Sequence, residues 1–134
     1  MIDHEDALIY TMVLVSAADG NMSDAEMRII GDNVRDLPVF AAYERDKLTQ
    51  TLRECADLLA AENGLDEAFA RIKAALPTKL RETAYALACD VVAADGEASQ
   101  EELRVLELIR HRLSIDRLIA AAIERGTRAR FMTA

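Results

Sequence analysis

The stretch AADGNMSDAEMRII at residues 17–30 decides the architecture, because the chain repeats it as AADGEASQEELRVL at residues 93–106. The copies are offset by 76 residues, and half of their positions are identical. Two copies are too few for a solenoid, so the repeat predicts one domain built from two related halves. The identical pairs are Ala17/Ala93, Ala18/Ala94, Asp19/Asp95, Gly20/Gly96, Ser23/Ser99, Glu26/Glu102 and Arg28/Arg104.

Apolar residues recur at helical spacing along the chain, and no stretch shows the alternating pattern of a strand. We therefore predict an all-α, single-domain helical bundle over residues 1–134. The repeat copies should span about 3–37 and 78–113, separated by an insert at 38–77. About seven helices are expected, at 3–18, 23–37, 39–62, 65–76, 78–94, 99–113 and 115–125, with a loose tail at 127–134.

Several details of these helices follow from single residues. The helices at 3–18 and 78–94 are the most apolar and should be enclosed at the centre of the bundle. Asn63-Gly64 and Gly126 have the residue types that end helices. In the helix that follows Ser99, we expect Leu103 and Leu106 to be buried.

Charge and composition restrict the possible partners. The chain carries 24 acidic and 16 basic side chains, a net charge of −8, which repels nucleic acids and anionic membranes. The longest apolar run, residues 7–18, is shorter than the roughly 20 residues of a membrane span. The acidic start of the chain lacks the pattern of a leader peptide. We therefore expect a cytoplasmic protein that binds a protein partner, binds no nucleic acid and does not insert into a membrane.

The histidines and cysteines suggest no catalytic centre. Cys55 and Cys89 are widely spaced within apolar segments, which favours core residues over a disulfide or zinc site. His4 and His111 lie in charged surroundings, and no nucleophile, base or phosphate-binding loop is recognisable. We predict a protein that is not an enzyme and needs no organic cofactor.

The repeated segment itself reads first as a helix corner. Gly20 and Gly96 follow apolar helices, where a residue without Cβ can turn the chain. Ser23-x-x-Glu26 and Ser99-x-x-Glu102 have the capping-box pattern, in which a serine and a glutamate satisfy each other's backbone amides.

Asp19 and Asp95 need a further explanation. Each carboxylate stands at the negative end of a helix dipole, and helical spacing leans it toward packed surface. Two interpretations remain open. The amides of the following turn could brace each aspartate, or a divalent cation could be held by Asp19 and Asp95 with Glu26, Glu102 or loop carbonyls. Neither loop has the EF-hand spacing.

At these residues the chain resembles the TerB-like family, a helical domain associated with tellurite resistance and also found attached to some DnaJ-type cochaperones. An apolar helix runs into Ala17-Ala18-Asp19-Gly20 with Ser23-x-x-Glu26. Tyr85-Ala86-Leu87-Ala88 leads in the same way into Ala93-Ala94-Asp95-Gly96 with Ser99-x-x-Glu102. The resemblance covers about residues 5–125 and includes the ending Arg112-Leu113-Ser114-Ile115-Asp116.

The resemblance implies an all-α cytoplasmic protein with a role in the response to tellurite or another stress. Acidic positions of the family have been proposed to bind metal ions. Carried over residue by residue, that proposal falls on Asp19, Glu26, Asp95 and Glu102, with a divalent ion of unknown identity. The alternative is a metal-free module that presents an acidic helical surface to another protein.

Overall fold

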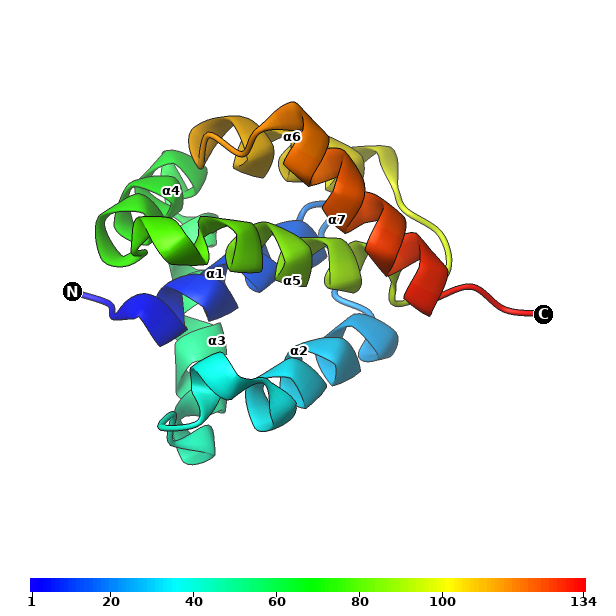
Figure 1. Ribbon diagram of the computed structural model, residues 1–134. Coiled ribbons are helices and arrows are strands. Elements are labelled where there is room, and N and C mark those ends of the chain that lie inside the picture. Colours follow the sequence, from blue (N-terminus) through cyan, green and yellow to red (C-terminus); the bar gives the residue numbers. More distant parts are fainter.

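Helix α1 (His4–Ser16) is the centre of the fold. In the computed structural model, which describes residues 1–134, every residue from Ala7 to Ser16 is buried. Helix α1 packs against five other helices, and its most extensive contact is with α5 (Arg81–Ala93). Figure 1 shows α1 and α5 side by side through the middle of the molecule. The prediction of two central helices is thus confirmed, although α5 is less fully enclosed.

The remaining helices surround this pair. The all-α, single-domain bundle of seven helices agrees with the prediction, and three short 3₁₀ turns connect them. The outer helices are α2 (Asp24–Asp36), α3 (Leu48–Ala60), α4 (Gly64–Ala75), α6 (Gln100–Arg112) and α7 (Arg117–Arg130). None of the helices is long and apolar enough to cross a membrane.

The two repeated corners have the same local backbone geometry. Gly20 and Gly96 adopt positive φ angles of 77° and 82°, which glycine tolerates without steric strain. Ser23 and Ser99 then cap α2 and α6, and a complete capping box is present at both helices. The capping boxes predicted for Ser and Glu are therefore confirmed. The two glycines turn the chain as expected, but α1 and α5 already end at Ser16 and Ala93, before the glycines are reached.

The predicted helix at 39–62 is wrong in its first part. A 3₁₀ turn occupies Pro38–Phe40, a second one occupies Arg45–Lys47, and α3 begins only at Leu48. Phe40 is buried and its ring packs edge-on against Tyr43, whose hydroxyl lies 3.0 Å from the Thr51 hydroxyl. These contacts hold the chain in a turn that a continuous helix would not allow.

The predicted helix end at Gly126 is wrong, and so is the first part of the loose tail predicted at 127–134. Helix α7 continues through Gly126 to Arg130. Arg130 Nη2 lies 2.6 Å from Asp90 Oδ1, and Thr127 Oγ1 donates to the same oxygen at 3.5 Å. These bonds to α5 offset the low helix propensity of glycine, which is a weak preference that tertiary contacts override.

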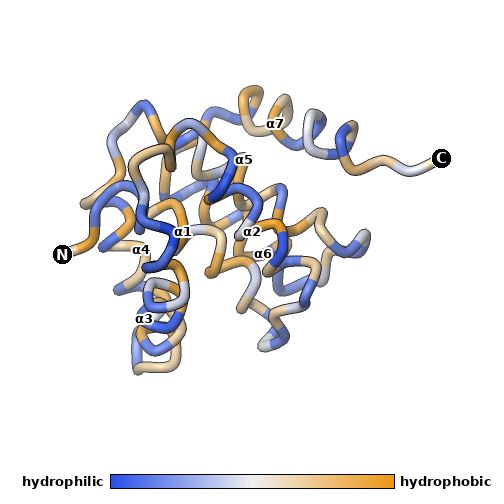
Figure 2. Tube along the Cα trace, turned by 90° about the horizontal axis from the view of Figure 1, so that it is seen from below, coloured by the Kyte–Doolittle hydropathy of each residue, from blue (hydrophilic) through white to orange (hydrophobic).

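Leu103 is 45% exposed, so its predicted burial is wrong. The inward face of α6 instead runs through Glu102, Val105, Leu106 and Ile109. Figure 2 shows that α7 is mainly hydrophobic in its first half and mainly hydrophilic in its second half. Both helices therefore leave apolar side chains at the surface, among them Leu118 at 80% exposure.

Two glycines provide a matched test of this packing. A Cβ at Gly64 would stand 2.1 Å from the Leu58 carbonyl oxygen, whereas a Cβ at Gly31 meets nothing within 4 Å. Gly64→Ala should lower the free energy of unfolding by about 2 kcal/mol or more, and Gly31→Ala should raise it by about 0.5–1 kcal/mol. Urea unfolding measures both, and equal effects would contradict the close contact between α3 and α4.

Candidate binding site at the paired helix corners

Asp19 and Asp95 lie on the surface and brace their own loops. The Asn21 N–H donates to Asp19 Oδ1 at 3.0 Å, and the Glu97 N–H donates to Asp95 Oδ1 at 3.4 Å. Both aspartates are exposed, so the expectation that they lean toward packed surface is wrong. The expectation extended the helical spacing too far, because α1 ends at Ser16 and Asp19 already belongs to the turn.

Glu26 and Glu102, in contrast, are buried to an extent that is unusual for glutamate. Glu26 is only 1% exposed and Glu102 only 2%. Glu26 Oε1 accepts hydrogen bonds from the Ser23 N–H at 3.0 Å and from the Ser16 hydroxyl at 3.2 Å. The second bond connects the start of α2 to the end of α1.

Glu102 is less well satisfied than its counterpart. Its Oε1 accepts a hydrogen bond from the Ser99 N–H at 2.9 Å, but its Oε2 is buried without a hydrogen-bond donor. The neighbouring group is the carboxyl of Glu26, which is close enough for a hydrogen bond between the two side chains. Neither glutamate has a basic side chain within 4.0 Å.

The repeat itself accounts for this asymmetry. The position 76 residues after Ser16 is Val92, so the second copy has no hydroxyl where the first has one. Glu26 therefore receives a side-chain donor that Glu102 lacks. A buried polar atom without a partner is destabilising, so Glu102 Oε2 requires a positive charge or a proton.

The pair perturbs its own ionisation. Burial, and after it the hydrogen bond to Glu26 and the charge of Glu26, raise the pKa of Glu102 from 4.5 to about 7, although the hydrogen bond from the Ser99 N–H acts in the opposite direction. Below pH 7 the Glu102 carboxyl is therefore mainly protonated. Its O–H can then donate to Glu26, and this bond removes the repulsion between the two acids.

Of the four site residues that the sequence predicted, the fold brings Glu26 and Glu102 together and leaves Asp19 and Asp95 at the surface. No group of three or more His, Cys, Asp and Glu side chains is arranged to hold a metal ion. The predicted set is thus divided into a buried glutamate pair and two loop-bracing aspartates.

A second acidic feature was not singled out from the sequence. A pocket of about 260 Å³ lies between the start of α1, the turn before α3 and α3 itself. Burial and neighbouring carboxylates raise the pKa of Glu5 and of Asp6. The acidic residues at the start of the chain could have indicated this pocket. The acidic residues that line it are Asp3, Glu5, Asp6, Glu44 and Glu54, and Lys47 is the basic one.

The ionisation of Glu102 predicts a pH-dependent stability. Between pH 4.5 and pH 7 the folded chain keeps the proton that the unfolded chain releases, so stability falls as the pH rises. The parent protein should lose about 2 kcal/mol over this range relative to Glu102→Gln, which cannot ionise.

Urea unfolding at several pH values measures this difference. Glu101→Gln is the matched control, because Glu101 is the exposed neighbour on the same helix turn. Parallel curves for the parent and Glu102→Gln would show that the buried pair does not hold the proton.

Comparison with known proteins places the chain in a family. The family model described as tellurite resistance protein TerB matches residues 5–124, which is most of the chain and includes both corners. Neither the curated proteins nor the solved structures gave a match. The matched segment contains the buried part of α1, residues 7–16, and both glutamates of the pair. The chain therefore belongs to the TerB family of tellurite resistance proteins.

Proposed function

We propose that this chain is a non-enzymatic, cytoplasmic stress-response protein of the tellurite-resistance type, and that it binds a divalent metal ion through Glu26 and Glu102. The observation that carries the proposal is the buried Oε2 of Glu102, which lacks a donor and adjoins a second carboxyl group. A cation would supply the positive charge that this pair otherwise takes from a proton.

The number of available ligands favours magnesium over calcium. Glu26 and Glu102 would hold the ion, with the Ser16 hydroxyl as a neighbouring oxygen. Magnesium is commonly bound through one or two carboxylates and keeps several waters, whereas calcium takes six to eight oxygens. The exposed Asp19 and Asp95 would add negative potential around the corners without being inner ligands.

The potential nucleophiles support the non-enzymatic part of the proposal. Burial raises the pKa of the Cys55 and Cys89 thiols to about 12, which leaves them protonated and poorly reactive. His111 is exposed, its Nε2 lies 3.9 Å from the Glu107 carboxylate, and it does not line the acidic pocket at the start of α1.

Titration calorimetry with magnesium, manganese, calcium and zinc tests the metal site. We expect the parent protein to bind magnesium or manganese, and Glu102→Gln to weaken that binding about tenfold or more because it removes one of the two carboxylates. Asp95→Asn should bind within about threefold of the parent, since Asp95 only braces its loop.

Two results would contradict this assignment. One is an absence of ion binding by the parent protein. The other is a loss of binding in Asp19→Asn/Asp95→Asn while Glu102→Gln still binds, which would indicate that the aspartates, and not the glutamates, hold the ion.

A second candidate function is a metal-free module that binds a basic protein surface. The acidic pocket at the start of α1 favours it, because five carboxylates and one lysine line a space suited to arginine or lysine side chains. A hexa-arginine peptide measured by fluorescence anisotropy should bind the parent and lose affinity as salt rises from about 0.1 M to about 1 M.

The matched variants for this second function differ only in position. The double variant Glu5→Gln/Glu54→Gln should bind the peptide about three- to tenfold more weakly than the parent. Glu62 is exposed and outside the pocket, so Glu62→Gln should leave the affinity unchanged. Equal binding by all three proteins would remove the pocket from consideration.

A further inference from the structure

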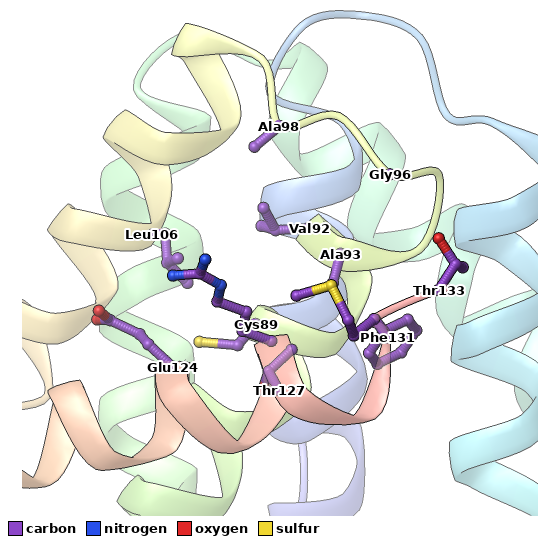
Figure 3. Close-up of a pocket in the computed structure, with 12 residues that line it drawn as sticks. Cys89, Val92, Ala93, Gly96, Ala98, Leu106, Glu124, Thr127, Phe131 and Thr133 are labelled. Carbon is purple, nitrogen blue, oxygen red and sulfur yellow. The ribbon is translucent and has the colours of Figure 1, made fainter.

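A separate groove lies between α5, α6, α7 and the second corner. It has a volume of about 480 Å³, within the range of roughly 300–1,000 Å³ that is usual for small-molecule sites. Figure 3 shows Glu124 at one end of the groove and Phe131 with Thr133 at the other. Thr127, Phe131 and Thr133 come after residue 124, so this part of the groove lies outside the segment that the TerB family model matches.

The walls of the groove are mainly apolar. Cys89 belongs to this apolar wall, since burial raises the pKa of its thiol to about 12 and keeps it uncharged. Met132 remains 62% exposed although it lines the groove, which leaves apolar surface without a partner. The apolar lining includes Cys89, Val92, Ala93, Leu106, Phe131 and Met132.

The two charged side chains that line the groove, Glu124 and Arg128, differ in their partners within the protein. The Tyr85 hydroxyl donates to the Glu124 carboxylate, so that carboxylate already has a partner within the protein. On the same helix, Arg130 is paired with Asp90. Arg128 lines the groove and has no acidic partner within 4.0 Å. The groove therefore combines apolar walls with the unpaired guanidinium of Arg128 and the hydrogen-bonded carboxylate of Glu124.

We propose that this groove binds a medium-chain aliphatic carboxylate, with the chain against the apolar walls and the carboxylate paired with Arg128. The apolar body of such a ligand covers the exposed apolar surface of Met132 and Phe131. Its carboxylate matches the planar guanidinium, which accommodates two parallel hydrogen bonds. A cationic amphiphile would place its charge beside Arg128 and is disfavoured by the same contact.

Calorimetry with decanoate tests the proposal. We expect saturable binding of one decanoate per chain, weaker binding of the uncharged decanol and none of decyltrimethylammonium. Arg128→Ala should weaken the binding of decanoate by about three- to tenfold. Ala98→Trp should also weaken it, because the larger side chain enters the groove from an exposed loop position without disturbing the core. Thermal unfolding confirms that each variant is folded.

Arg125→Ala is the matched control, since Arg125 is an exposed arginine of α7 that neither lines the groove nor forms an ion pair. It should bind decanoate as the parent does. Absence of saturable binding, or equal losses in Arg128→Ala and Arg125→Ala, would overturn the proposal. A concentration-dependent dimer that excludes decanoate would assign the groove to a second copy of the chain and would overturn it as well.

Discussion

The burial of α1 from Ala7 to Ser16 is the constraint on which the rest of the structure depends. Ten consecutive residues without exposed surface require helices on every side, and five helices contact α1. The last of these residues, Ser16, also reaches Glu26. The packing that encloses α1 therefore also positions the corner that follows it, and the pairing with α5 brings the second corner to the first. The glutamate pair follows from this arrangement of the core.

Much of the fold could be predicted because the local signals are strong. The apolar character of residues 7–16 indicated a central helix, and the two serine-glutamate pairs marked the starts of α2 and α6. The errors came from tertiary contacts that no local pattern encodes. Phe40 folds back into the core before α3 begins, and Asp90 holds α7 in helical form beyond Gly126. In both places contacts between distant segments override local propensity.

The sequence singled out Glu26 and Glu102 but did not predict that both would be buried. Sequence reasoning explained the glutamates as caps and looked to the aspartates for function, whereas the burial is found at the glutamates. One signal could have shown this. Glu26 shares a helical stripe with Ile30 and Val34, and Glu102 shares one with Leu106. Their contact across the two corners depends on how α1 and α5 pack, which the spacing within one helix does not determine.

The central claim is that Glu102 and Glu26 act as one buried acid pair that requires a proton or another cation. Carbon-13 NMR titration of the Glu102 carboxyl carbon tests it most directly. The account predicts a midpoint near pH 7 in the parent protein and a lower midpoint in Glu26→Gln, because that change removes the neighbouring charge. A Glu102 midpoint near the ordinary value of 4.5, unaffected by Glu26→Gln, would contradict it.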